Sequence, residues 1–501
     1  MGRGAALLES GASGVRRCCG CDTPKKRARF VGTVAVGSEG IGMTIDLHLK
    51  THDCIDAIRG ALEAHKNEWQ QYLQCFDPPF NSLLIVRDWQ GRVHIGVPGS
   101  KKFDKLPEAS RAALRAARDA LAAATGVLLF EPDGFVYSED LFDADALWAG
   151  TDKVLWDELD PLSVYWIERQ AKEKIWTQSP SAVDGPHPLR VVFFGIKGGV
   201  GRSSALLASA YYLLAQGKKV LVLDADFESP GVSATLLADD LRPDYGLLDW
   251  FALDAIRPEL ASELISTRRL VERSGLEATV VGEGAVWVAP SFGRETQDYV
   301  GKLGRLYQDV AEQGYVRRFK RLLDGLEAEL QPDVVLLDSR AGVDDTAAVA
   351  LTQLDAHGLL FATHGRATWA AYGHLFKHWQ HFAHLRAGGD DFRSKLHVVS
   401  ALTPVDAGYD RAFLDASYRL FLDHLYEELK ADQMESDGFN YGADDPDAPH
   451  RPWRVRWDDV LRHFDPIQNP AQLDAAVFEK AFGELKQLLD QLLGAEDLDH
   501  E

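Results

Sequence analysis

The sequence is poor in cysteine and in long apolar runs, and each shortage excludes a class of protein. Five cysteines occur in 501 residues, three of them crowded at Cys18, Cys19 and Cys21, so a disulfide framework is excluded. The longest apolar runs, such as 191–196, fall far short of the roughly 18–20 residues that a membrane span needs. The N-terminus lacks the apolar segment of a secretory signal. We therefore expect a cytoplasmic protein without a membrane partner.

Positive charge is also scarce, which bears on the partners of the protein. The chain has 54 Lys and Arg against 76 Asp and Glu, a net charge of −22. Nucleic acid is not expected as a partner, because phosphate contacts need a basic face. A basic-aromatic stretch at 449–464 offers charge and stacking, but Asp458 and Asp459 lie within it and its WRVRW alternation predicts an edge strand.

Composition and hydrophobic periodicity divide the chain into five predicted segments. These are a basic arm at 1–42, a small α+β module at 43–178, a linker at 179–188, an α/β domain at 189–470, and a C-terminal helix with an acidic tail at 471–501. The linker is predicted because three prolines and a glycine fall within SPSAVDGPHP. The arm has two interpretations, either a disordered segment or a start codon assigned too early.

The small module shows no catalytic or metal-binding constellation. Helical spacing is predicted over 53–75, two strands at 82–88 and 92–97 joined by a hairpin turn at 89–91, and an Ala-rich helix at 107–124. Five aromatic residues are expected in helical stretches that follow, namely Trp148, Trp156, Tyr165, Trp166 and Trp176. We predict that the aromatic residues form core and that the module binds a protein partner.

Between 189 and about 405, short aliphatic runs alternate with helical patterns. The runs include LRVVFFGI, KVLVLD, AVWVAP, DVVLLD, GLLFAT and KLHVVSA. Continuous aliphatic strands alternating with helices are typical of a parallel sheet that is buried on both faces. The pattern therefore predicts an α/β fold with a doubly wound, mostly parallel sheet.

A glycine-rich loop follows the first of these strands and leads at once into a helix. The loop comprises Lys197, Gly198, Gly199, Val200, Gly201, Arg202, Ser203 and Ser204. Glycines let successive amides turn toward a phosphate chain, and the helix N-terminus adds partial positive charge. Arg202 is expected to reach the β- and γ-phosphates, and the Ser203 hydroxyl to bind Mg²⁺. Strand, loop, cation, hydroxyl and helix in this order predict a nucleotide site.

Three aspartates directly end predicted buried strands. Asp224 and Asp226 follow KVLVL, and Asp338 ends DVVLLD. Each should emerge at the carboxyl edge of the sheet, where doubly wound sheets bind ligands. Helix capping is the alternative role for these carboxylates.

These motifs resemble those of the deviant Walker A ATPases, the ParA/MinD-like, SIMIBI-class branch of P-loop NTPases, whose loop reads KGGxGK[ST]. The resemblance covers about 189–405. It implies that Lys197 reaches the partner subunit's nucleotide, that Asp226 positions the attacking water, that Asp224 lies beside the Mg²⁺ shell and that Asp338 is associated with Mg²⁺. ATP and Mg²⁺ are the implied cofactors, ATP hydrolysis the implied activity, and a nucleotide-dependent homodimer the implied assembly.

One residue departs from the pattern of the resembling family. Arg202 stands where the family has the lysine that ends the loop. Arginine keeps the charge but is longer and planar, so nucleotide binding is expected to survive while hydrolysis is expected to be slow. Arg202→Lys is expected to keep binding and to hydrolyse at least as fast.

Three functions fit the sequence. The first is an ATP-driven switch whose nucleotide state controls dimerisation and partner binding. The second is a nucleotide-binding scaffold with negligible turnover, and the third is an ATP-dependent ligase or synthetase whose substrate pocket the 234–330 region supplies. Arg340 and Asp344 are expected either to couple nucleotide state to the dimer face or to form an ordinary salt bridge.

Overall fold

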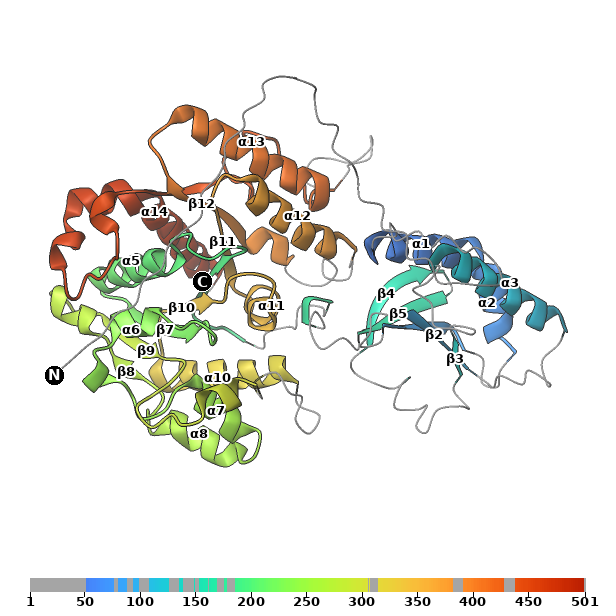
Figure 1. The fold of residues 1–501 in the computed structure, drawn as a ribbon, viewed down its shortest axis with the longest axis horizontal. Helices are drawn as coiled ribbons and strands as arrows, with labels where there is room; N and C mark the ends of the chain where they lie inside the picture. The colour runs from blue at the N-terminus through green and yellow to red at the C-terminus, as the bar shows by residue number, and fades with distance from the viewer. Residues whose placement is uncertain are drawn as a thin grey trace, which may run out of the picture. The chain divides into compact units, whose positions relative to one another are not determined.

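A computed structural model shows two sheets with their helices (Figure 1). The structure describes residues 51–75, 80–87, 93–98, 108–125, 135–137, 148, 153–160, 162–168, 175–177, 185–304, 306, 314–381, 391–427 and 438–499. The predicted arm, its cysteines and most of the predicted linker lie outside the described residues.

The small module contains a mixed five-stranded sheet of order β3-β2-β1-β5-β4. Its elements are α1 (Thr51–Ala64), α2 (Lys66–Leu73), β1 (Ser82–Arg87), β2 (Val93–Val97), α3 (Glu108–Thr125), β3 (Phe135–Tyr137), β4 (Lys153–Leu159), β5 (Leu162–Glu168) and the 3₁₀ helix η3 (Ile175–Thr177). The predicted antiparallel pairing of the two strands is confirmed, since β1 pairs with β2, while the predicted turn at 89–91 lies outside the described residues. The Ala-rich helix is confirmed as α3, and the predicted helix at 53–75 is two helices that are separated at His65.

The expectation that the module's aromatic residues lie in helical stretches is wrong for three of the five. Trp156 lies in β4, and Tyr165 and Trp166 lie in β5. Trp148 is helical, and Trp176 lies in the 3₁₀ helix η3. In β5 the fully buried Trp166 alternates with the half-buried Tyr165, as expected for a strand with one face on the core. Aromatic residues favour such half-buried pleated surfaces.

The α/β domain contains an eight-stranded sheet of order β13-β12-β11-β6-β10-β7-β9-β8. Its strands are β6 (Leu189–Gly195), β7 (Lys219–Ala225), β8 (Glu272–Arg273), β9 (Ala285–Ala289), β10 (Val334–Ser339), β11 (His357–Ala362), β12 (Leu396–Thr403) and β13 (Trp453–Arg456). Every neighbouring pair is parallel except β8 and β9. The predicted parallel sheet is therefore confirmed, as is the edge strand at WRVR.

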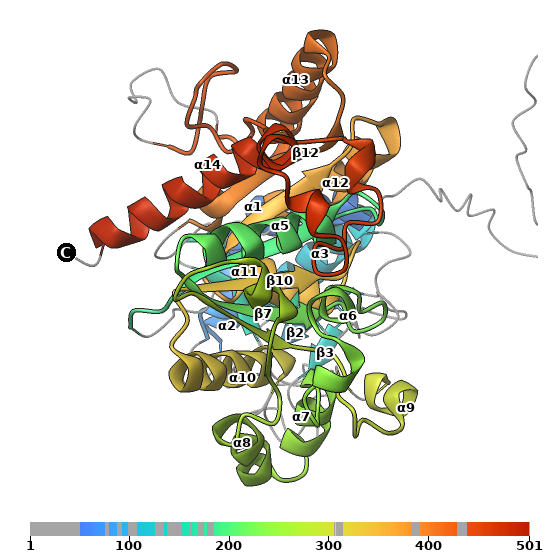
Figure 2. The same ribbon diagram turned by 90° about the vertical axis from the view of Figure 1, so that its left-hand side faces the viewer.

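Helices cover both faces of this sheet. They are α5 (Arg202–Ala215), α6 (Val232–Leu236), α7 (Leu247–Asp254), α8 (Pro258–Ser266), α9 (Tyr299–Leu303), α10 (Tyr315–Leu330), α11 (Asp345–Thr352), α12 (Arg366–His381), α13 (Ala407–His424) and α14 (Ala475–Asp499). Val191 and Phe193 of β6 pack in the core that α5 and α14 complete, whereas Val192 and Phe194 pack in the core that includes α10 and α11. Figure 2 shows α5 and α14 on one side of the sheet and α10 on the other. This is the doubly wound arrangement that the sequence predicts.

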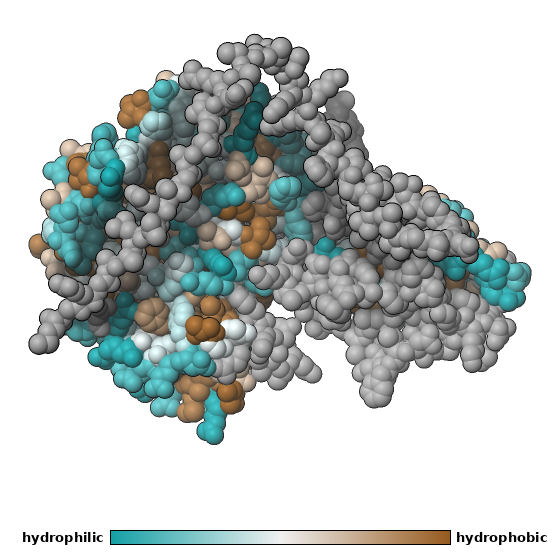
Figure 3. All heavy atoms as spheres, in the orientation of Figure 1, coloured by the Kyte–Doolittle hydropathy of each residue, from teal (hydrophilic) through white to brown (hydrophobic). Residues whose placement is uncertain are grey.

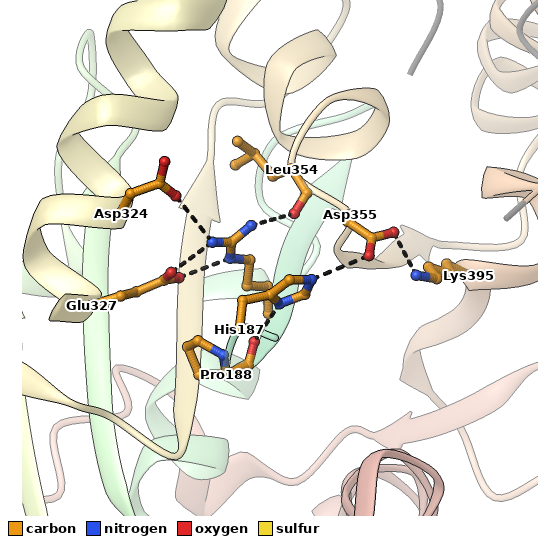
Figure 4. A network of polar contacts seen from close by, with 8 residues as sticks. His187, Pro188, Asp324, Glu327, Leu354, Asp355 and Lys395 are labelled. Carbon is orange, nitrogen blue, oxygen red and sulfur yellow. Dashed lines mark hydrogen bonds and ion pairs between the residues drawn. The ribbon is translucent and has the colours of Figure 1, made fainter. Parts of the chain in front are cut away.

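Ion pairs fasten the amino end of β6, the strand that leads into the glycine-rich loop (Figure 4). Arg190 of β6 is buried and donates to both carboxylate oxygens of Glu327, at 2.7 and 2.6 Å, and to the Leu354 carbonyl oxygen at 2.9 Å. His187 bonds Asp355 at 3.1 Å, and that bond raises the pKa of His187 above its usual value. These contacts fix β6 against α10 and the turn before β11, so the loop at the other end of β6 starts from a rigid strand.

The described surface is mixed in character. Figure 3 shows hydrophilic and apolar residues interspersed on one face of the molecule. Among the described helices, none is both long enough and apolar enough to cross a membrane.

Candidate functional site

The glycine-rich loop connects β6 to α5 at the carboxyl edge of the sheet. Gly199 and Gly201 have φ angles of 72° and 79°, in the left-handed region that favours glycine. The loop is exposed at Lys197, Gly198 and Gly199 and buried at Val200. Val200 therefore anchors the loop in the core, while the residues before it face solvent. A Cβ at Gly198 or Gly199 would meet nothing within 4 Å. The loop amides and the N-terminus of α5 therefore offer an open cradle for a phosphate chain.

The three candidate carboxylates gather beside this loop. The sheet places β10 between β6 and β7, and the register pairs Asp338 of β10 with Asp224 of β7. Asp226 follows β7 directly. The Ser203 hydroxyl, in the first turn of α5, donates to Asp338 Oδ2 at 3.2 Å. The structure thus brings the predicted loop hydroxyl and the three predicted carboxylates to one edge of the sheet.

These carboxylates are buried and incompletely hydrogen-bonded. Asp224 is 0% exposed, Asp338 2% and Asp226 7%. One oxygen of each, Oδ1, has no hydrogen-bond partner among the described residues. Buried polar groups are nearly always paired, and an unpaired one costs about 1–3 kcal/mol. The site therefore contains three acceptors that a bound cation or its waters would satisfy.

Burial also shifts the acid–base behaviour of the site. Desolvation is the main cause that raises the pKa of Asp224 to about 6 and that of Asp338 to about 8, and the neighbouring carboxylates contribute. Burial likewise raises the pKa of Asp226, while the charge of Arg202 opposes this shift. A nearby positive charge is needed to ionise all three groups near neutral pH.

The donor set fits Mg²⁺ that arrives with a nucleotide. Among the described residues, no three His, Cys, Asp or Glu side chains form a self-sufficient metal cluster. Mg²⁺ does not need such a cluster, because it usually keeps several waters and takes one or two carboxylates plus phosphate oxygens. Ser203 and Asp338 would hold the ion directly, with Asp224 close to its waters.

The side chain of Arg202 points into the domain. It is buried, its Nη1 donates to the Ser339 carbonyl oxygen, and its Nη2 lies 3.6 Å from Asp226 Oδ2. The guanidinium thus ties α5 to the ends of β10 and β7. The expected contact with the β- and γ-phosphates stays a prediction.

Two residues that sequence reasoning did not assign shape the site. Ser233 of α6 donates its amide and its hydroxyl to Asp224 Oδ2, at 3.0 and 2.6 Å. Leu402 of β12 has a φ of 53°, and its Cδ2 would lie 3.3 Å from a Cβ at Gly201. Ser233 lies in the same glycine-containing segment as Asp224 and Asp226, and this closeness in sequence is a signal that could have indicated its contact with Asp224. No sequence signal indicates a left-handed leucine.

Comparison with known proteins gives remote structural likenesses. A ParA family ATPase from Chlorobium tepidum TLS is 15% identical, covers 61% of this chain and 98% of its own, and gives a TM-score of 0.37. pNOB8 ParA bound to nonspecific DNA is 17% identical, covers 63% of this chain and 100% of its own, and gives a TM-score of 0.37. Cobyrinic acid a,c-diamide synthase from Mycobacterium smegmatis, with bound ATP analog and magnesium, is 17% identical, covers 46% of this chain and 82% of its own, and gives a TM-score of 0.32.

No protein-family model and no curated protein matches the chain.

Proposed function

We propose that the protein binds ATP with Mg²⁺ and hydrolyses the ATP slowly, as a switch whose nucleotide state controls dimerisation and partner binding. The observation that carries the proposal is the position of three buried, unpaired carboxylate oxygens beside an open glycine-rich loop. At such a site, buried carboxylate oxygens without a hydrogen-bond partner favour a bound cation, and the loop amides beside them favour a bound anion. A Mg²⁺–triphosphate complex satisfies both.

Each residue of the site has a role in this proposal. The amides of residues 198–204 and the N-terminus of α5 bind the phosphates, and Ser203 and Asp338 hold the metal ion. Bound Mg²⁺ would neutralise charge on the phosphate oxygens. Asp226 orients the attacking water, and Lys197, which is exposed, is free to reach a second copy of the chain. Catalysis of this kind is mainly positioning and charge neutralisation.

The proposed partner is a protein that binds through the 43–178 module. Nucleic acid is not proposed as a partner, because two arginines of the basic-aromatic stretch at 449–464 already pair with carboxylates. Arg454 pairs with Glu484 at 3.0 Å and with Asp410 at 3.1 Å, and Arg456 pairs with Asp410 at 3.5 Å.

Phosphate release and mass measurement together test the proposal. We expect Mg²⁺-dependent release of phosphate from ATP, and a doubling of the mass by light scattering when ATP and Mg²⁺ are added. Asp226→Asn should keep the mass change and lose the release. A wild-type protein that binds no ATP at millimolar concentration would remove the proposal.

A scaffold with negligible turnover is a second candidate, favoured by one observation. The guanidinium of Arg202 is held by Ser339 and Asp226, inside the domain. If it stays there when nucleotide binds, the phosphates lack the cation that usually ends the loop. ATP-induced dimerisation without phosphate release would support this candidate over the first.

A ligase or synthetase is a third candidate, because a pocket adjoins the loop that follows Asp226. It has a volume of about 370 Å³ and is lined by Pro230, Phe292, Thr296 and Tyr299. The Tyr299 hydroxyl donates to the Phe227 carbonyl oxygen, so the pocket shares a wall with the site. Phosphate release that requires a small-molecule acceptor would support this candidate.

A further inference from the structure

Arg340 joins the loop after β7 to the loop after β10, the two strands whose carboxyl ends bring the candidate carboxylates together. It lies two residues beyond Asp338 and forms ion pairs with Glu228 Oε1 and, at 3.5 Å, with Asp344 Oδ2. Glu228 lies two residues beyond Asp226, in the loop that follows β7. One guanidinium therefore bridges the loop after β7 and the loop after β10.

Both ends of this bridge are fixed to the sheet. Asp344 caps α11 by accepting from the Thr346 amide at 2.9 Å. The Gly342 amide donates to the Gly195 carbonyl oxygen at 3.0 Å, which ties the loop after β10 to the end of β6. The Ser229 amide donates to the Asp226 carbonyl oxygen at 3.1 Å, so Glu228 lies in a tight turn that begins at Asp226. A displacement of Glu228 would therefore move Asp226.

The charges around Arg340 explain why the bridge is needed. Asp226, Glu228 and Asp344 face one another across the two loops and repel when ionised. Burial and the charge of Asp344 raise the pKa of Glu228, and Arg340 opposes that shift. Without the guanidinium, repulsion among these carboxylates would open the gap between the loops.

We propose that Arg340 is a positioning residue that clasps the Asp226 loop to the loop after Asp338 and so fixes the orientation of Asp226. The inference rests on the proposed hydrolysis of ATP for its kinetic consequence. The attachment of one loop to the other by Arg340 does not depend on that function. Arg340 acts through Glu228, so it should influence the turnover step much more than the binding of nucleotide.

The test compares Arg340→Ala, Glu228→Gln and the double variant with a matched control, Arg411→Ala. Arg411 also joins two carboxylates, Asp415 at 3.0 Å and Asp444 at 2.9 Å, but on α13 and the segment after it. We expect Arg340→Ala to lower kcat about tenfold and to change KM less than about threefold. Glu228→Gln should lower kcat similarly, the double variant should be no worse than Arg340→Ala, and Arg411→Ala should resemble the wild type.

Hydrogen–deuterium exchange without nucleotide supplies a readout that needs no activity. Peptides that cover 226–233 and 339–344 should exchange faster in Arg340→Ala than in the wild type or in Arg411→Ala, and Arg340→Lys should restore part of the protection. Unchanged exchange in Arg340→Ala would overturn the clasp. So would additive losses of kcat in the double variant, or a KM raised tenfold with kcat kept, which would place Arg340 on the nucleotide instead.

The two failures are distinguishable. A wild type that releases no phosphate contradicts the proposed hydrolysis, and the exchange experiment still decides the clasp. A wild type that hydrolyses ATP while Arg340→Ala matches it in rate and in exchange contradicts the clasp alone.

Discussion

Asp338 is expected to destabilise the protein that lacks metal and nucleotide, and its replacement by asparagine should reveal this. Its side chain is buried, with one oxygen accepting from Ser203 and the other unpaired. Burial, reinforced by the charge of Asp224, raises the pKa of Asp338 to about 8 from a usual value of 3.8. The folded state therefore favours the protonated form of this group.

The sign and size of the effect follow from this shift. A group whose pKa is higher in the folded state binds more protons there, so its stabilising contribution is present at low pH and is lost as pH rises through about 8. Between about pH 6 and pH 8 the free energy of unfolding should fall by about 2 kcal/mol through the linked titration of Asp338 and Asp224. Asparagine carries no charge, so Asp338→Asn should escape this loss.

Urea unfolding of both proteins, without Mg²⁺ or nucleotide, measures the effect. The stability of Asp338→Asn relative to the wild type should rise by about 2 kcal/mol from about pH 6 to about pH 8. Titrating groups outside the site, including the buried histidines, cancel because both proteins contain them. Asp224 does not cancel, because its charge and that of Asp338 act on each other, so its titration is part of the measured difference. Asp240→Asn, which changes an exposed carboxylate, is the control. Parallel pH profiles for Asp338→Asn and the wild type would refute the reasoning.

Three further predictions concern the glycine-rich loop. Arg202→Lys should keep ATP binding but lower the free energy of unfolding in urea by about 1–3 kcal/mol, because an ammonium cannot reach both Ser339 and Asp226. An unchanged urea midpoint would show that the contacts of Arg202 with Ser339 and Asp226 do not stabilise the fold. Lys197→Ala should bind ATP with an affinity within about threefold of the wild type, yet form no ATP-induced dimers in light scattering. Without the lysine, the two triphosphates of a dimer would repel by a few kcal/mol. Normal ATP-induced dimers in this variant would contradict the proposed role of Lys197 across the dimer. Gly201→Ala should weaken ATP binding at least about tenfold in calorimetry, since φ is 79° and Leu402 is close. Its control, Gly217→Ala, has a φ of 77° with nothing within 4 Å and should bind normally.

The arrangement of the α/β domain could be predicted because its signals are local. Each strand from β6 to β12, apart from the two-residue β8, is a short aliphatic run, and the order strand, glycine-rich loop, helix fixes which end of the sheet carries the loop. Once the strands are parallel, residues that end them, such as Asp224 and Asp338, must lie at one edge.

Contacts between distant parts of the chain could not be predicted. Arg202 bonds Ser339, which is 137 residues away, and nothing in the loop's own sequence indicates that its guanidinium points inward. The left-handed Leu402 lies where the pairing of β12 with β13 shifts register, between Ser400 and Thr403, and it has no local signal in the sequence. In the small module, the sequence predicts helical stretches at Trp156 and Trp166, because a period of two over a few residues is hard to distinguish from helical spacing.

Calorimetric titration with a slowly hydrolysed ATP analogue measures whether Mg²⁺ and nucleotide bind to this site together. The wild type should bind the analogue only weakly without Mg²⁺ and much more tightly with it, because the metal ion satisfies the buried carboxylates. Asp338→Asn should lose the enhancement by Mg²⁺ while keeping its fold. No heat at millimolar analogue in the presence of Mg²⁺, or the same affinity with and without the metal in the wild type, would contradict the account.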